Sequence, residues 1–186
     1  MRLIDLNEQL KARKKMTINT SFFFSVPTGV IMFLLTISGG FFEAIAFGAL
    51  TFGFIFALIY ILREVTHKSV DRKRTKTEIK NPHLDVRYKG EIGLLEFTKD
   101  AFVFRSLTPG SPNKEFNIEI NKELFIAAGP IVYKPLQKLQ HRGIEEGYIN
   151  VKPMPHGIPR QFLFYNVDHA LDKVSEILSD IDQFEG

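Results

Sequence analysis

The chain of 186 residues contains no cysteine. This absence excludes a disulfide framework, a thiolate zinc site and a cysteine nucleophile, and it agrees with a reducing compartment, where disulfides are rare. Glycine-rich nucleotide loops of the known spacings are also missing. We therefore expect no nucleotide cofactor. We also expect no metal site, because the histidines lie far apart and outside the usual zinc-ligand spacings. They are His67, His83, His141, His156 and His169.

Charge is nearly missing from two long stretches. Residues 16–37 (MTINTSFFFSVPTGVIMFLLTI) carry no charged side chain, and residues 41–62 (FFEAIAFGALTFGFIFALIYIL) carry only Glu43. Each run is long enough to cross about 30 Å of hydrocarbon as a helix. Residues 38–40 (SGG) suit a tight reversal, because glycine tolerates positive φ. The sequence therefore predicts a two-helix transmembrane hairpin over residues 16–62.

Two other interpretations of the first run are weaker. A cleaved signal peptide usually has an apolar stretch of about 7 to 15 residues followed by a mature soluble start, whereas here a second apolar run follows at once. A helical hairpin in a soluble core would show a polar stripe on each helix. Neither run has such a stripe.

Basic residues flank the hairpin and are missing from its turn. By the positive-inside rule, we expect a multi-pass protein of the cell membrane with both termini in the cytoplasm. Glu43 then lies near the outer interface and is a membrane-site candidate. The flanking basic residues are Lys11, Arg13, Lys14 and Lys15 before the first run, and Arg63, Lys68, Arg72, Lys73, Arg74, Lys76 and Lys80 after the second.

Three features surround or interrupt the apolar runs. Residues 1–15 form a basic amphipathic segment, expected at the inner membrane surface or packed on the soluble domain. Small residues such as Gly29, Gly48 and Gly53 predict close helix packing within the hairpin or in a homo-oligomer. Residues 63–82 form a charged juxtamembrane linker, whose basic side chains either contact anionic lipid or merely stop translocation. The predicted lipid contacts are Arg72, Lys73, Arg74 and Lys76.

The pattern of short apolar runs in residues 83–186 predicts a small α+β domain. Val167 to Ile181 carries one apolar stripe, which predicts a helix with Asn166 as its N-cap. Strands without intervening helices, followed by one amphipathic helix, describe an antiparallel sheet or barrel closed by that helix. The short apolar runs that predict strands are residues 84–89, 93–98, 101–106, 116–120, 124–128, 131–134, 148–152 and 161–165.

The runs YKGEIGLLEFTKDAFVFRS, FNIEI and RQFLFYNVDHALDKVSEIL resemble the bacterial PH-like and GRAM-like domains, over residues 84–182. The resemblance implies an antiparallel β-barrel of about seven strands capped by a C-terminal helix. It also implies binding of proteins or lipid head groups, without enzymatic activity. Phosphoinositide binding does not carry over, because the turn at Lys99 and Asp100 is a poor phosphate cradle.

Basic side chains outside the linker are the candidate partner or lipid contacts: Lys134, Lys138, Arg142, His156 and Arg160. Nucleic-acid binding is not expected, since a dense basic stripe with aromatic partners is missing. The neighbours Glu145 and Glu146 are expected on the solvated surface and not as a general acid/base pair.

These features together favour a non-enzymatic membrane-anchored accessory or regulatory protein. Its PH-like module would be presented at the cytoplasmic face of the membrane, where it contacts the lipid surface and a protein partner. The alternative hypothesis makes the hairpin itself the active element, acting through Glu43, as in a small transporter subunit or a bacteriocin-immunity-like protector.

Overall fold

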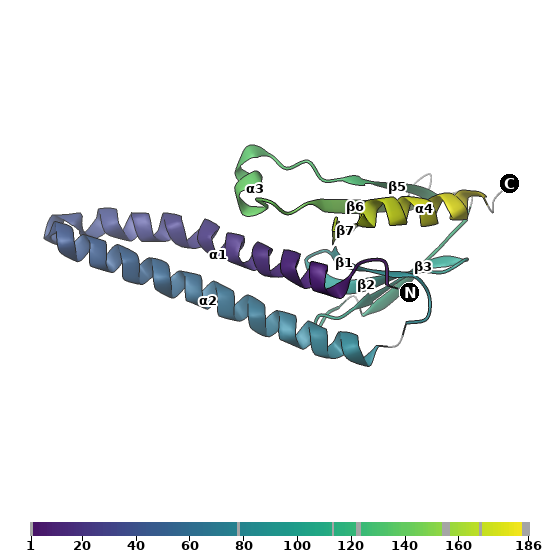
Figure 1. Ribbon diagram of the computed structural model, residues 1–186, viewed down its shortest axis with the longest axis horizontal. Coiled ribbons are helices and arrows are strands. Elements are labelled where there is room, and N and C mark those ends of the chain that lie inside the picture. Colours follow the sequence, from purple (N-terminus) through teal and green to yellow (C-terminus); the bar gives the residue numbers. More distant parts are fainter. Residues whose placement is uncertain are drawn as a thin grey trace. The chain divides into compact units, whose positions relative to one another are not determined.

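A computed structural model of the protein describes residues 2–77, 79–112, 114–121, 124–153, 157–167 and 169–183 (Figure 1). The chain forms two compact units. The sheet unit comprises Met1–Ala12, Ser69–Val132 and Ile144–Gly186, and the hairpin unit comprises Arg13–Lys68 and Tyr133–Gly143. The chain therefore passes between the units four times.

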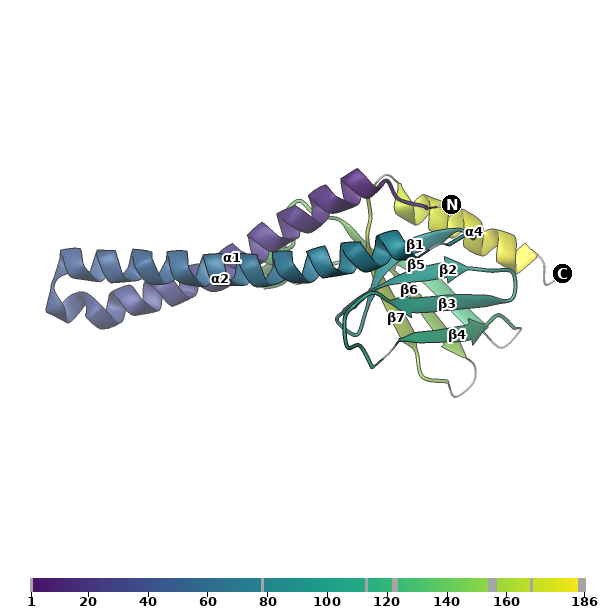
Figure 2. The same cartoon turned by 90° about the horizontal axis from the view of Figure 1, so that it is seen from below.

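Two long helices run antiparallel to each other, α1 (Leu6–Thr36) and α2 (Phe41–Lys76), as Figures 1 and 2 show. A single 3₁₀ turn (Ile37–Gly39) ends α1, and Gly40 follows with φ 146° before α2 begins. The predicted helical hairpin with a glycine turn is confirmed. Both helices extend beyond the apolar runs, because the flanking Glu, Gln, Lys and Arg residues are good helix formers.

Seven antiparallel strands form one sheet in the order β4-β3-β2-β1-β7-β6-β5. Strands β4 and β5 are its two edges, so the sheet is open and the expected closed barrel is not found. The C-terminal helix is α4 (Ala170–Gln183). The strands are β1 (His83–Tyr88), β2 (Glu91–Phe97), β3 (Ala101–Ser106), β4 (Glu115–Glu119), β5 (Leu124–Pro130), β6 (Glu146–Pro153) and β7 (Arg160–Tyr165).

The prediction of two strands around Gly129 and Pro130 is wrong. A single strand, β5, runs through both residues, and residues 131–134 lie outside the sheet. Pro130 is tolerated because β5 is an edge strand, where a missing N–H breaks no central ladder. Gly129 pairs with Tyr148 of β6, whose ring occupies the space over it, since a Cβ on Gly129 would lie 3.1 Å from the Tyr148 hydroxyl oxygen.

Two clusters of buried hydrophobic residues lie in the sheet unit, and the larger one forms its main core. Its largest fully buried side chains come from the central strands. Helix α4 adds Ala170, Val174 and Leu178, as its predicted apolar stripe requires, and the Asn166 side chain accepts a hydrogen bond from the Leu171 N–H at 3.0 Å. The N-terminal residues Leu3 and Ile4 also belong to this core. The fully buried phenylalanines are Phe102, Phe104, Phe162 and Phe164.

The segment before α1 is therefore part of the sheet unit. Leu3 donates its N–H to the carbonyl oxygen of His83 at 3.1 Å, and Lys173 of α4 donates to the Leu3 carbonyl at 3.0 Å. Leu6 and Leu10, which share the predicted apolar stripe with Leu3, are about one-third exposed. Two roles were predicted for this segment, contact with the membrane surface and packing on the folded domain. Leu3 packs on the folded domain.

Candidate membrane-contact surface

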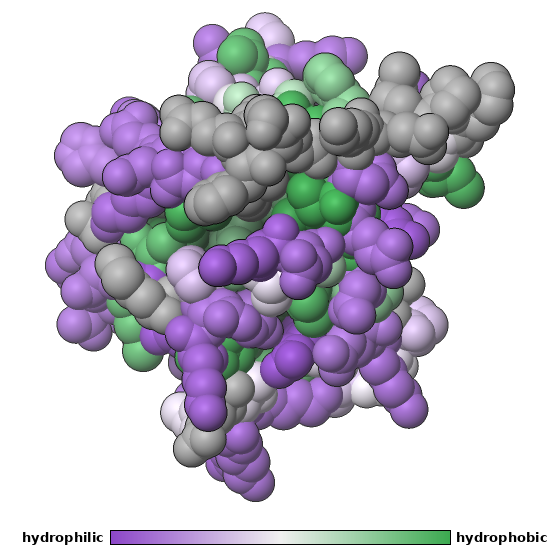
Figure 3. Space-filling model, turned by 90° about the vertical axis from the view of Figure 1, so that its right-hand side faces the viewer, coloured by the Kyte–Doolittle hydropathy of each residue, from purple (hydrophilic) through white to green (hydrophobic). Residues whose placement is uncertain are grey.

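Large apolar side chains cover the outside of α1 and α2. Phe42, Leu50 and Leu35 are 84%, 70% and 69% exposed, and only 11% and 6% of the most apolar windows of the two helices are buried. A core helix of a soluble protein would be mostly buried. Both helices are long and apolar enough to cross a membrane. The sheet unit differs, because hydrophilic side chains cover most of its described surface on the side shown in Figure 3.

Three hydroxyl side chains in the N-terminal half of the first span are buried. Thr17, Ser21 and Ser25 are at most 2% exposed, although charged and polar residues normally seek water. The Thr17 hydroxyl donates to the Arg13 carbonyl at 3.1 Å, the Ser21 hydroxyl to the Thr17 carbonyl at 2.9 Å, and the Ser25 hydroxyl to the Ser21 carbonyl. Each hydroxyl is therefore satisfied within the helix, as an apolar surrounding would require.

The two helices approach each other closely where two glycines face each other. A Cβ on Gly29 would lie 3.0 Å from the Phe52 Cβ and 3.1 Å from the Gly48 carbonyl oxygen, and a Cβ on Gly48 would lie 3.1 Å from the Gly29 carbonyl oxygen. Ala44, one helical turn before Gly48, is fully buried. This confirms the predicted packing role for Gly29 and Gly48. Gly53 does not share it, because a Cβ there meets nothing within 4 Å.

Glu43 lies at the hairpin turn, in the first turn of α2, and is exposed. A Cβ added to Gly39 or Gly40 would lie 3.6 Å from its Oε2 atom. The carboxylate thus sits over the turn and near the helix N-terminus, where a negative charge is favourable. The alternative hypothesis, in which Glu43 and the hairpin meet a membrane target, stays a prediction.

The four basic residues predicted to contact lipid after α2's apolar run have different surroundings. Arg72 and Lys76 are exposed, and the exposed Lys73 donates its ammonium to the Thr108 carbonyl oxygen at 3.2 Å. Arg74 is only 6% exposed. Its guanidinium points into the interior of the sheet unit, where it forms ion pairs and is not available to contact lipid.

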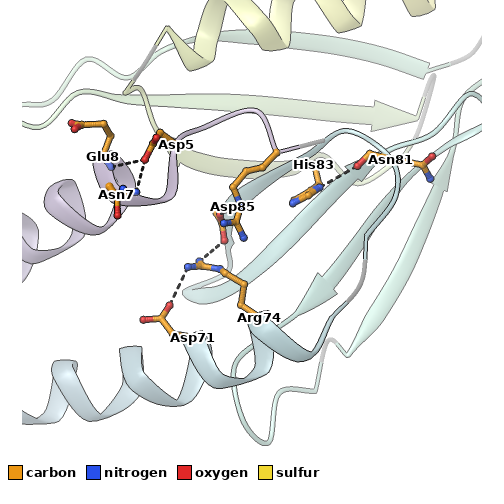
Figure 4. A network of polar contacts seen from close by, with 9 residues as sticks. Asp5, Asn7, Glu8, Asp71, Arg74, Asn81, His83 and Asp85 are labelled. Atoms are coloured by element: carbon orange, nitrogen blue, oxygen red, sulfur yellow. Dashed lines mark hydrogen bonds and ion pairs between the residues drawn. The ribbon is translucent and has the colours of Figure 1, made fainter.

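The buried Arg74 guanidinium joins the end of α2 to strand β1 (Figure 4). It donates to the carboxylate of Asp85, whose side chain is 2% exposed, and to that of Asp71 at 3.0 Å. Nearby, His83 Nδ1 lies 3.1 Å from the Asn81 carbonyl oxygen, and burial lowers the pKa of His83 below its ordinary value. Buried charges need such partners, because an unpaired charge in the interior is costly.

The remaining candidate contacts fall on two different units. Lys134, Lys138 and Arg142 are all exposed on the connection between β5 and β6, within the hairpin unit. Arg160 lies at the start of β7 in the sheet unit, with its Cζ 4.4 Å from the ring centroid of Phe116. His156 lies outside the described residues. The structure therefore brings three of the five predicted contacts together.

Three exposed apolar residues on the same connection were missed by the sequence-based prediction. Val132, Leu136 and Leu139 are 87%, 73% and 62% exposed. The signal was present, because the two leucines are three residues apart, as on one face of a helix. The connection contains a short helix, α3 (Pro135–Gln140).

The prediction that the acidic neighbours Glu145 and Glu146 both lie on the surface is wrong for Glu146. Glu145 is exposed, but Glu146 is 2% exposed on β6 and forms an ion pair with Arg87 of β1. Arg87 also lies over the Tyr165 ring, with its Cζ 5.6 Å from the centroid. Among the described residues, no three His, Asp or Glu side chains are grouped closely enough to hold a metal ion.

Comparison with known proteins adds no family to these observations. The resemblance to PH-like and GRAM-like domains stays a prediction. No protein-family model, no curated protein and no solved structure matches the chain.

Proposed function

We propose that the chain is a non-enzymatic, membrane-anchored accessory or regulatory protein. Helices α1 and α2 cross the bilayer as a hairpin, and the sheet unit acts as a PH-like binding module at the cytoplasmic face. The observation that carries this proposal is the exposed apolar surface of both helices, combined with the burial of the Thr17, Ser21 and Ser25 hydroxyl groups of α1. An apolar surface of this extent in water would drive association or aggregation.

Length and charge support the same arrangement. The apolar runs of residues 16–37 and 41–62 are each about 33 Å long as helices, at 1.5 Å per residue, and the hydrocarbon core is about 30 Å thick. Basic residues gather at the ends away from the turn, whereas the turn carries only Glu43. By the positive-inside rule, both termini lie in the cytoplasm, and Glu43 is hydrated at the opposite interface.

The open edge at β4 offers a protein partner a place to bind. Ser106 donates its N–H to the Lys114 carbonyl at 2.9 Å, and Ile120 donates to the Asp100 carbonyl at 2.8 Å. Bonded and non-bonded pairs alternate along an antiparallel ladder, so every second residue of β4 turns its N–H and C=O away from β3. A partner strand can add to such an edge. The outward-facing residues are Glu115, Asn117 and Glu119.

Anchoring makes a weak edge contact sufficient. A module confined to the membrane surface meets a membrane-bound partner at a high effective concentration, so binding needs little affinity of its own. The charged side chains along β4, exposed at Glu115 and Glu119, oppose indiscriminate pairing between sheet edges. Together these features suit selective and reversible binding of one partner.

The anchor is tested by labelling single thiols. Because the natural chain has no cysteine, Ser38→Cys in the hairpin turn and Ser175→Cys on α4 each carry one thiol. A membrane-impermeant maleimide should label Ser38→Cys in intact cells, and Ser175→Cys only after the cells are opened. The reverse pattern would contradict the orientation, and recovery of the protein in the aqueous fraction without detergent would contradict the anchor itself.

The partner contact is tested at Asn117. Proline there removes an N–H that β3 does not use, so the domain should fold while a crosslinked membrane partner is no longer recovered with it. Asn117→Ala, which keeps the N–H, is the matched control and should retain the partner. Equal recovery with both variants would exclude β4 as the binding edge.

A further inference from the structure

The connection between β5 and β6 leaves the sheet and joins the hairpin unit. Residues 133–143 pack along α1 (Figure 1), where three side chains fasten them. Lys15 donates its ammonium to the Gly143 carbonyl at 2.9 Å, Asn19 donates its amide to the Arg142 carbonyl at 3.1 Å, and the Gln140 amide donates to the Thr20 hydroxyl at 3.3 Å. Helix α3 is thus held at a fixed level along α1.

This segment is also closed on itself. The Tyr133 and His141 rings stack with centroids 3.9 Å apart, which brings together the two ends of the excursion. Gln137 of α3 accepts a hydrogen bond from the Lys134 N–H at 3.3 Å through its side chain. The segment is therefore an ordered element with its own contacts.

The level at which α3 is held is the start of the apolar surface. Phe22, the first large exposed apolar residue of α1 beyond Leu10, is two residues after Thr20, which corresponds to about 3 Å along the helix axis. The basic residues Lys14 and Lys15 lie on the other side of Thr20. In a hairpin that crosses the bilayer, Thr20 therefore lies at the boundary between head groups and hydrocarbon.

The side chains that α3 exposes at this level are of two kinds. Leu136 and Leu139, three residues apart, share one helical face and are 73% and 62% exposed. Lys138 lies on another face of α3, and Lys134 and Arg142 are exposed just before and just after the helix. An apolar face next to a basic face is the pattern of a segment that lies in the membrane interface.

We propose that α3 is a second membrane-contact element, which lies in the plane of the inner leaflet. Leu136 and Leu139 insert between lipid head groups, and Lys134, Lys138 and Arg142 pair with the phosphates of anionic lipids. The inference rests on the proposed transmembrane hairpin. A lipid surface is favoured over a protein occupant, because the two leucines are exposed at the level of α1 where its exposed apolar surface begins.

Insertion of the two leucines and pairing of the basic residues with phosphates contribute separately to the binding of α3 to the membrane. Insertion of the leucines is driven by the removal of apolar surface from water, whereas the basic residues are attracted to the surface only by anionic lipid. The contact is therefore expected to depend on lipid charge without being abolished in neutral lipid.

The test places a fluorescent probe on single cysteines in the full-length protein. The variants are Leu139→Cys on α3, Ile61→Cys on the outside of α2 and Ser175→Cys on α4. Each is labelled with an environment-sensitive dye and reconstituted in vesicles of phosphatidylcholine and phosphatidylglycerol that contain a lipid with a nitroxide near the top of its acyl chain. We expect quenching of the probes at positions 139 and 61, and none at position 175.

The three probes separate the two proposals. Quenching at position 61 without quenching at position 139 would overturn the role of α3 and leave the anchor in place, and a dye at position 139 that is shielded from water but not quenched would indicate a protein occupant instead. The absence of quenching at position 61 would overturn the anchor and, with it, this inference.

A charge-matched pair of variants tests the basic face. Lys134→Gln with Lys138→Gln, in the Leu139→Cys background, should lose part of the quenching in vesicles that contain phosphatidylglycerol. Lys99→Gln with Lys114→Gln, at exposed positions of the sheet unit, removes the same charge and should leave the quenching unchanged. Equal quenching in both pairs, and in pure phosphatidylcholine, would overturn the pairing with anionic lipid.

Discussion

Two arginines near the end of α2 show that one residue type can have two different roles in the same helix. Arg72 and Arg74 stand two residues apart near the end of α2, in the same charged stretch. Arg72 is exposed, whereas Arg74 is buried and bonded to Asp85 and Asp71. A buried pair of this kind does not guarantee extra stability, but the loss of one partner leaves an unsatisfied charge.

We expect Asp85→Asn to lower the free energy of unfolding of the sheet unit by about 3 kcal/mol, the low end for breaking a buried pair, because Asp71 still contacts Arg74. Asp172→Asn is the matched control. Asp172 pairs with His169 at 3.4 Å, but both side chains are at least 80% exposed, and such surface pairs contribute little.

The measurement is denaturant unfolding of the full-length protein in micelles, followed by the circular dichroism of the sheet. Asp85→Asn should lower the midpoint, and Asp172→Asn should leave it in place. Equal midpoints for the two variants would show that the buried pair is not needed for stability.

At the residue level, the sequence predicted residue classes and not their partners. Basic side chains that flank the apolar runs were recognised from their position along the chain, but the burial of Arg74 depends on Asp85, which reaches it through tertiary packing. Glu146 was missed for the same reason, since its partner Arg87 lies on a strand 59 residues away in sequence.

At the scale of elements, the hairpin is built on small residues. Gly29 and Gly48 allow the backbones of α1 and α2 to approach, and Phe33 and Phe52 pack directly beside them. Between helices in lipid, van der Waals packing replaces the hydrophobic effect as a source of association, so a close fit matters more than in water.

Gly48→Leu should therefore separate the two helices, because its Cβ alone would come within 3.1 Å of the Gly29 carbonyl oxygen. Overpacking of this kind typically costs about 1 to 3 kcal/mol. The thermal unfolding of the helical signal in micelles should shift to lower temperature. Gly53→Leu, at an open position of the same helix, should leave that unfolding unchanged, and an equal shift in both variants would show that leucine harms α2 regardless of packing.

Long, strongly patterned elements were predictable from the sequence. The two apolar runs predicted α1 and α2, and the stripe of α4 and most strands also follow from local periodicity. The openness of the sheet was not predictable, because closure depends on whether β4 and β5 meet, and no local pattern records that. The strand through Pro130 was missed because the cost of proline depends on whether its strand is central or at an edge.

On the scale of the whole molecule, the sheet unit is assembled from three separate stretches of the chain. Its core includes Ile4 from the first residues, 2% exposed, and Val174 and Leu178 from the last helix. The N-terminal segment is thus part of the folded domain, although the whole hairpin separates it from the strands in sequence.

Ile4→Ala should lower the free energy of unfolding of the sheet unit by about 2 to 4 kcal/mol, in the usual range for emptying a buried aliphatic site. Leu10→Ala removes an apolar side chain of the same N-terminal segment that is 37% exposed, and it should have a much smaller effect. Denaturant unfolding in micelles compares the two. A similar loss in both variants would mean that this segment acts through membrane attachment and not through the core.

The placement of Leu3 and Ile4 in the same core as α4 also sets an order of events during synthesis. The hairpin leaves the ribosome long before the strands do, so its helices can form while the domain is still unmade. The first residues cannot complete their packing until the final helix emerges, and Lys173 can bond to Leu3 only once translation is almost finished. Chains that stall before that point lack α4 and therefore carry an incomplete core.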